Sequence, residues 1–247
     1  MKTIYILWLR QLKRYFRSRS RMIGSLAQPL FFLLSLGYGF GPVFKAAGQG
    51  SYIQFLVPGI IGMSIIFTSI FSGMEIIWDR QFGFLKETLV APVSRFNIMI
   101  GRTLGGATVA TMQGVLVFLI SLFIGFKPIH WGLVPLAIVI MLLSALLFTA
   151  MGTAIASRLE DMQGFQLIMN FLVMPLFFLS GAIFPLAGAG LLGKIAQFDP
   201  LSYSVDALRS LLSGISQFGI GADFCILAII TFAFLALGSY FFSKIQI

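Results

Sequence analysis

Residues that could carry out covalent or metal chemistry are few in this sequence and stand far apart. The 247 residues include one histidine, His130, and one cysteine, Cys225. Catalytic triads and histidine-containing metal sites need partners that the chain does not obviously supply. A single cysteine also excludes a disulfide within the chain and a cysteine-rich metal site. We therefore predict no catalytic or metal-binding residue here, which disfavours a membrane-embedded enzyme.

One segment, Gly188 to Ile195 (GAGLLGKI), comes close to the pattern of a phosphate-binding loop. The last position of that pattern must be Ser or Thr, whose hydroxyl reaches the magnesium ion, and here it is Ile195. No buried strand is expected before the segment. The sequence predicts no nucleotide site at this position.

Composition fixes the class of protein. Hydrophobic residues make up 58% of the chain, charged residues only 10%, and the mean hydropathy is +0.98. Apolar runs of about 20 residues recur, and each is long enough to cross a bilayer as a helix. We expect an all-α integral membrane protein with one domain over residues 1–247. The six expected spans are 22–42, 54–78, 101–125, 132–156, 165–184 and 222–243.

The segments outside these spans have different expected roles. Residues 1–21 should form an amphipathic helix, 22–184 should hold spans one to five, and 221–247 should hold span six with a short tail. Residues 185–220 are moderately apolar but include Lys194, Asp199, Asp206 and Arg209. We interpret that stretch as re-entrant or interfacial, on the outer side of the membrane.

Positive charge sets the expected orientation. Six spans place both termini on one side, with the loops near 79–100 and 157–164. That side carries thirteen of the seventeen Lys and Arg residues, and the other side carries four. The termini are therefore predicted to be cytoplasmic in a multi-pass protein of the plasma, or inner, membrane. The same bias accounts for most of the net charge of +9 and leaves little support for nucleic-acid binding.

Ionisable residues avoid the middle of the expected spans and lie near their ends, as Glu75 and Arg102 do. Ion-coupled transporters usually need ionisable groups at mid-membrane depth, and voltage sensors need rows of arginine. If this bundle moves a solute uphill, the energy is expected to come from another protein.

The first residues form an amphipathic pattern. On a helix, one face would carry Ile4, Trp8, Leu12, Tyr15 and Phe16, and the other Arg10, Lys13, Arg14 and Arg17. Such a helix lies in the membrane surface with its cations towards anionic headgroups. The pattern fits a membrane anchor and a helix that also contacts a partner equally well. We expect Glu75 to form an ion pair with Arg10, Arg14 or Arg17.

The longest polar stretch after residue 25 is 79–95, DRQFGFLKETLVAPVSR. Phe82, Leu85 and Leu89 fall at i, i+3 and i+7, which gives one apolar stripe on a two-turn helix that Pro92 limits. A short helix with exposed apolar and charged groups could dock into a groove of a soluble partner. Spacing alone favours an ordinary interfacial loop instead.

The stretch DRQFGFLKETLVAPVSRFNIMIGRTL closely resembles the signature loop of type-2 ABC export permeases. The matching positions are Asp79, Arg80, Gly83, Leu85, Leu89, Pro92, Arg95, Gly101 and Arg102. FFLSGAIFPL (177–186) and DPLSYSVDALRSLL (199–212) are similar to the end of the family's fifth span and to its outer segment. The resemblance covers nearly the whole chain.

This resemblance implies a permease subunit with a cytoplasmic coupling helix between spans two and three, docked on a separate ATPase. The implied interface is Arg80, Phe82, Gly83, Phe84, Leu85, Lys86, Glu87, Thr88, Leu89, Pro92 and Arg95. Trp8, Arg10, Lys13, Arg14 and Arg17 would belong to a connecting helix beside it, and 185–220 would be the outer re-entrant element. Two permeases, forming a homodimer, would work with two ATPases. The ATPases would bind ATP and magnesium, so this chain would bind no cofactor.

The implied activity is export of a hydrophobic or amphiphilic substrate, drug or lipid-like, as in the similar daunorubicin- and multidrug-resistance permeases. Export of a lipid-linked polysaccharide is the alternative. A non-transporting membrane scaffold or immunity protein is the alternative from another class.

Overall fold

The computed structural model describes residues 2–48, 50–90, 92–186 and 190–245, without the side chains of Arg21 and Lys86. These described residues form helices, turns and loops and include no β-strand. In chain order the elements are α1 (Lys2–Arg17), α2 (Arg19–Ala46), α3 (Tyr52–Ser72), α4 (Met74–Gln81), α5 (Phe84–Val90), α6 (Arg95–Phe123), the short 3-10 helix η1 (Trp131–Leu133), α7 (Val134–Ala156), α8 (Met162–Leu179), α9 (Leu191–Ala196), α10 (Pro200–Ser213) and α11 (Ile220–Ser243).

Six segments are long and apolar enough to cross a membrane, so the predicted fold class is confirmed. They are 22–46, 52–81, 95–123, 131–156, 162–179 and 220–243. The two largest differences from the expected boundaries have local reasons. The third span begins at Arg95 because the Ser94 side chain caps the helix, accepting a hydrogen bond of 3.3 Å from the Asn97 backbone N–H. The fifth ends at Leu179, before Gly181 turns the chain with φ +72°.

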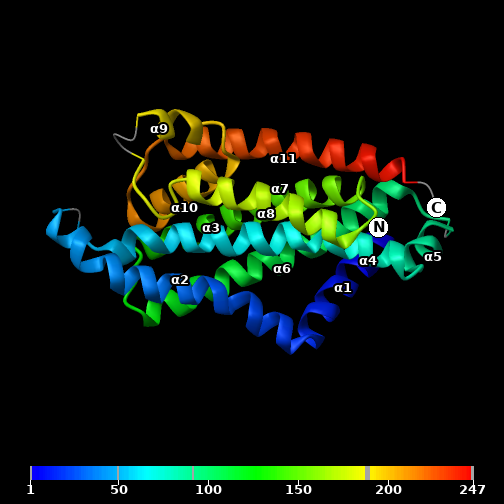
Figure 1. The fold of residues 1–247 in the computed structure, drawn as a ribbon, viewed down its shortest axis with the longest axis horizontal. Coiled ribbons are helices and arrows are strands. Elements are labelled where there is room, and N and C mark those ends of the chain that lie inside the picture. Colours follow the sequence, from blue (N-terminus) through cyan, green and yellow to red (C-terminus); the bar gives the residue numbers. More distant parts are fainter. Residues whose placement is uncertain (1, 49, 91, 187–189, 246–247) are drawn as a thin grey trace.

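The core of the bundle is built from α3, α6 and α7, which pack against one another, whereas α2, α8 and α11 lie at the periphery (Figure 1). Small residues let the central helices approach closely. A Cβ added at Gly73 would lie 2.5 Å from the Gly152 carbonyl oxygen, so the backbones of the second and fourth spans are in contact there. Side chains larger than hydrogen cannot occupy that crossing.

The segment before the last span contains a buried helix, α10. The fourteen residues of α10 extend about 21 Å, too short to cross a bilayer. They pack against α3, α7 and α11, and Val205 lies against Gly62 of α3. The exposed α9, by contrast, lies at the periphery of this end. Within the described part of this segment, α10 is therefore covered by other helices and α9 is exposed, and the re-entrant or interfacial placement stays a prediction.

Two charged residues of this segment, Arg209 and Asp206, are bonded inside the protein. Arg209 is buried, donates to the Gly181 carbonyl oxygen at 2.9 Å, and lies 3.9 Å from the centre of the Phe55 ring. The Asp206 carboxylate accepts hydrogen bonds from the backbone N–H groups of Gln217 and Phe218. These contacts close the outer end of the bundle, which explains polar residues in a segment that the chain buries.

The opposite end gathers segments that are far apart in sequence. The ends of the chain, α4 and α5 lie together there, away from α9 and α10 (Figure 1). Arg80 donates to the Leu159 carbonyl oxygen at 3.1 Å, and Arg95 donates to the Ile245 carbonyl oxygen at 2.8 Å. The 79–95 segment is thus bonded to the loop after α7 and to the residues that follow α11, as the six-span topology requires.

Candidate coupling site

The centre of this end is α5, a seven-residue helix between the second and third spans. Gly83 separates it from α4 and has φ +80°, a left-handed conformation that other residues adopt at a cost. Thr88 donates from its hydroxyl to the Phe84 carbonyl oxygen at 2.9 Å, a bond within the helix. After α5, the exposed Pro92 prevents the helix from continuing into α6.

The expected apolar stripe does not form a single exposed surface. Leu85 is only 2% exposed and belongs to the core of the helix bundle, and Leu89 packs against that core. Phe82 and Val90, by contrast, are each 80% exposed. The expectation that Leu85 offers itself to a partner is therefore wrong, because its side chain is already buried within the chain. Val90, which sequence reasoning missed, belongs to the exposed apolar surface instead.

The other predicted interface residues are divided between surface and internal bonds. Glu87 is exposed and Gly83 is half-buried, while Arg80 and Arg95 use their guanidinium groups on carbonyl oxygens of neighbouring segments. The Lys86 side chain lies outside the part of the chain that the structure describes. Among the described side chains, the exposed surface of this site includes Phe82, Glu87, Val90 and Pro92, with Phe84 36% exposed beside them.

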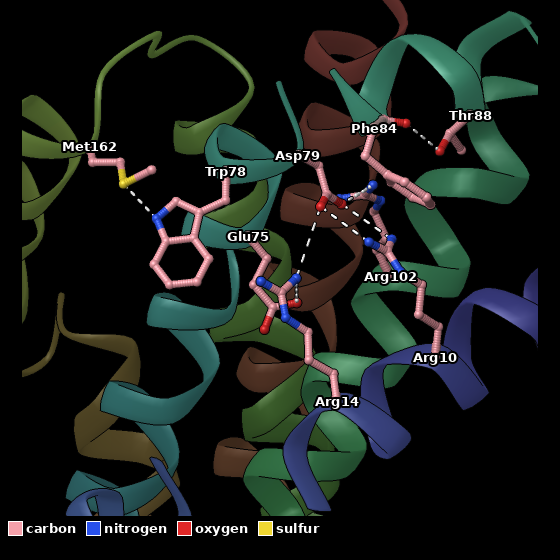
Figure 2. Close-up of polar contacts among 9 residues, drawn as sticks. All are labelled: Arg10, Arg14, Glu75, Trp78, Asp79, Phe84, Thr88, Arg102 and Met162. Carbon is pink, nitrogen blue, oxygen red and sulfur yellow. Dashed lines mark hydrogen bonds and ion pairs between the residues drawn. The ribbon is translucent and has the colours of Figure 1, made fainter. Parts of the chain in front are cut away.

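A cluster of ion pairs lies directly behind this surface, at the end of the second span. The Asp79 carboxylate accepts two hydrogen bonds from Arg10 of α1, at 3.1 and 3.2 Å (Figure 2). It also accepts one from Nη2 of Arg102 on α6, at 2.6 Å. One carboxylate therefore joins three elements, and a bidentate arginine pair fixes their relative orientation.

Burial differs strongly within the cluster. The Arg102 side chain is 3% exposed and that of Asp79 is 8% exposed, whereas Arg10 is 32% exposed. Nε and Nη1 of Arg102 have no hydrogen-bond partner among the described residues. Because a buried cation needs a counter-charge, Asp79 is the residue on which the stability of this corner depends.

A second acid, Glu75, lies one turn before Asp79 and also faces α1. Its Oε2 is 3.6 Å from Nη1 of Arg14, an ion pair of the kind expected from the sequence. The Arg14 guanidinium also lies 5.4 Å from the centre of the Trp78 ring. The Trp78 indole N–H in turn donates to the Met162 sulfur at the start of α8 (Figure 2). The fifth span is thereby linked to α1.

The first helix also contacts α5. The guanidinium carbon of Arg10 lies 3.8 Å from the centre of the Phe84 ring (Figure 2). The negative face of an aromatic ring attracts a cation electrostatically at this distance. Arg10 therefore bonds Asp79 with its nitrogens and covers Phe84 with its plane, so α1 and α5 share one contact point.

Two glycines of the third span form the seat of α1. A Cβ at Gly101 would lie 3.0 Å from the Leu7 Cβ, and one at Gly105 would lie 2.6 Å from the Gln11 Cβ. The Trp8 indole N–H donates to the Thr108 hydroxyl at 3.0 Å. The GxxxG spacing at the start of the span thus serves packing of α1 within one chain.

This packing corrects the expected orientation of α1. Arg10 and Arg14 were expected to point towards lipid headgroups, but both form ion pairs with carboxylates of the second span. Tyr15, expected on the lipid face, is buried. Lys13 and Arg17 remain exposed. The amphipathic pattern is the same for a helix that faces lipid headgroups and for a helix that packs on the bundle, since a buried carboxylate attracts cations as an anionic headgroup does.

Comparison with known proteins decides the family. Residues 2–213 match the family described as ABC-2 type transporter. The chain belongs to this family. It is 26% identical over 196 residues to Nodulation protein J of Rhizobium leguminosarum bv. viciae, covering 78% of this chain and 75% of the relative. It is 30% identical over 229 residues to the putative transport permease ycf38 of Pyropia yezoensis, covering 87% and 76%.

As an ABC-2 permease, this chain is a transmembrane subunit of an ABC transporter and a multi-pass membrane protein. Subunits of this kind are typically not catalytic. The described residues include no group of three or more His, Cys, Asp or Glu side chains that could hold a metal ion. What the site offers is a partly exposed short helix, α5, that contacts the core through Leu85 and α1 through Phe84.

Proposed function

We propose that this ABC-2 permease forms the membrane pathway of an ATP-driven exporter and that α5 is its coupling helix. A separate ATPase would dock on the exposed surface of Phe82, Phe84, Glu87 and Val90. The observation that carries the proposal is the position of α5. It is a surface helix at one end of the bundle, and Leu85 and Phe84 connect it to the core and to α1.

Movement of α5 would reach the spans through the ion pairs behind it. A push on Phe84 acts on Arg10, which holds Asp79 of the second span, and Asp79 also holds Arg102 of the third. Rigid helices and ion-pair networks transmit such displacements over tens of ångströms. Closure of the ATPase pair would therefore reorient α1 and the inner ends of these two spans together.

The proposed assembly has two copies of the permease and two ATPase subunits, with ATP and magnesium bound by the ATPases. Both termini and α5 would face the cytoplasm, where ATP is available, as the excess of Lys and Arg on that side favours. The permease would be a homodimer with a two-fold axis along the pathway. Peripheral helices α2, α8 and α11 are the parts of the chain free to form that contact.

The proposed substrate is hydrophobic or amphiphilic, drug- or lipid-like. A lipid-linked polysaccharide is the second candidate, because α2 carries aromatic side chains suited to stacking on sugar rings. Phe31 is 69% exposed and Tyr38 is 64% exposed. At the outer end of the same helix, Phe40 and Phe44 pack against Tyr52.

The test is efflux from proteoliposomes that hold the permease with its co-purified ATPase, supplied with ATP and no ion gradient. A fluorescent amphiphilic dye and a fluorescent polyprenyl-linked oligosaccharide would be the two cargoes. Movement of the dye supports the first candidate, and movement of the oligosaccharide supports the second. Efflux that requires an imposed proton or sodium gradient contradicts the ATP-driven mechanism. Neither cargo moving under any condition favours a scaffold.

A further inference from the structure

A cavity of about 340 Å³ lies between α2, α3 and α6, apart from the exposed face of α5. Gly24 of α2 and Phe67 of α3 are among its walls, and Tyr15 of α1 reaches it from the inner end. Its volume is in the range of sites that hold small ligands. Since its walls are segments of membrane-spanning helices, a lipid-soluble molecule can reach it from the bilayer.

The polar frame of the cavity follows from a proline in the first span. Pro29 has no backbone N–H, so the Ser25 carbonyl one turn earlier loses its helical donor. Nε2 of Gln113 on α6 donates to that carbonyl oxygen at 2.7 Å. The Thr68 hydroxyl of α3 donates to Oε1 of Gln113 at 2.7 Å. A buried glutamine thereby joins three spans, with its donor and acceptor groups in use.

One polar group in the wall remains available. Ser64 lines the cavity, is 1% exposed, and its hydroxyl has no hydrogen-bond partner among the described residues. A buried polar group without a partner costs free energy, and a ligand that bonds it removes the cost. A hydroxyl can donate and accept, so it suits a ligand hydroxyl or carbonyl group.

The wall is uncharged, and apolar residues line it beside the polar Tyr15, Ser25, Gln28, Ser64, Thr68 and Gln113. Phe67 and Phe71 are stacked, with ring centres 6.4 Å apart, and Met63 lies on the same helix. None of the eleven residues that line the cavity in the described chain is Asp, Glu, Lys, Arg or His. Such a site disfavours a charged ligand, because no counter-charge would replace the water that the charge loses.

We propose that this cavity binds a neutral amphiphile: an apolar chain or ring system against Phe67 and Phe71, and a hydroxyl or carbonyl group on the Ser64 hydroxyl. The proposal rests on the exporter function above and names the substrate class that its permease accepts on the side of the termini. Tyr15 connects the cavity to α1, whose Arg10 covers Phe84 of the coupling helix. Displacement of α1 therefore changes the wall of the binding site.

The experiment is photo-crosslinking of the full permease in nanodiscs with a monoacylglycerol that carries a diazirine in its acyl chain. Mass spectrometry of the peptides locates the labelled residues. A phosphatidylcholine with the same diazirine chain reports on ordinary lipid contact. We expect saturable labelling by the monoacylglycerol concentrated in 24–29 and 63–71, and weak, unsaturable labelling there by the phospholipid.

Two variants sharpen the result. Gly24→Leu should abolish most of the saturable labelling, because the space beside Gly24 is open and a leucine would occupy it. Gly39→Leu is the matched control: Gly39 lies on the same helix with equally open surroundings, and its substitution should leave the labelling unchanged. Ser64→Ala should raise the probe concentration needed for half-maximal labelling by roughly five- to tenfold, which corresponds to the loss of one hydrogen bond.

Three outcomes would overturn the proposal. The two probes could label 24–29 and 63–71 equally, which would mean that bulk lipid fills the cavity. Labelling could spread evenly over the exposed helix faces, or it could be absent because a second copy of the chain covers this side. None of these readouts needs ATP. Loss of labelling with ATP-driven export intact contradicts the cavity alone, and saturable labelling without export contradicts the exporter function.

Discussion

The Asp79 corner provides the sharpest test of how the inner end is held. In Asp79→Asn the side chain keeps its shape and loses its charge, while Arg102 stays 3% exposed with two guanidinium nitrogens unpaired. Removing one partner of a buried ion pair costs about 3–5 kcal/mol, because the remaining charge is uncompensated. The pair with Arg10 adds about 1 kcal/mol or less, since Arg10 is 32% exposed and partly screened by solvent.

The asymmetry of the cluster makes the prediction specific. Arg102→Met should cost less than Asp79→Asn, because Asp79 keeps its two bonds to Arg10. In the double variant, the destabilisation should fall well below the sum of the two single effects, since no buried charge is then left alone. Asp161→Asn is the matched control: it makes the same change at an exposed helix cap, and asparagine caps equally well.

The assay is unfolding of the purified permease by SDS in mixed micelles, followed by circular dichroism. If Asp79→Asn costs no more than Asp161→Asn, the corner does not depend on this charge. The reasoning would equally be refuted if the double variant were destabilised by more than the sum of the two single destabilisations. ATPase co-purification, measured on the same preparations, shows whether the corner also supports docking.

Three further outcomes are expected. Phe82→Ser should weaken ATPase co-purification without changing the unfolding midpoint, whereas Leu85→Asp should destabilise the permease itself by several kcal/mol, because the carboxylate would enter the core. Gly105→Leu should release α1, since even a Cβ would lie 2.6 Å from that of Gln11; faster proteolysis of the N-terminal segment would show it. Burial raises the pKa of Asp199 to about 7, so the folded state holds a proton that the unfolded state loses near pH 4. Stability should therefore fall as pH rises from 4 to 7 and then level off, and thermal melts of Asp199→Asn should show a weaker trend than those of the unchanged protein.

The spans could be predicted from sequence because length and hydropathy suffice for a bilayer-crossing helix. The burial of α10 could not. Charged residues such as Arg209 and Asp206 are typical of surface segments. Here Arg209 donates to the Gly181 carbonyl oxygen, and Asp206 accepts from the backbone N–H groups of residues 217 and 218. Such pairing depends on tertiary contacts that no local pattern records.

Helix α5 shows a second limit of prediction from sequence. Periodicity establishes that Phe82, Leu85 and Leu89 share a spacing, but it does not say which side of the helix the protein itself covers. A partner's groove and the chain's own core both favour apolar residues, so the pattern is identical in the two cases. The same ambiguity applied to α1, where Arg10 and Arg14 met carboxylates in place of headgroups. Only the exposure of each residue separates these arrangements.

The two ends of the bundle are held by different kinds of contact, and this difference bears on how energy enters. At the end that holds α10, helix backbones are in contact, because a Cβ at Gly59 would lie 2.1 Å from the Ala182 carbonyl oxygen. Such close packing has low compressibility. At the inner end, Arg10 and Arg14 are about a third exposed and hold their acids through charge. Ion pairs in contact with water can exchange partners at little cost. In the proposed mechanism, a force applied to α5 would therefore act on the arginines of α1 before it acts on the packed helices.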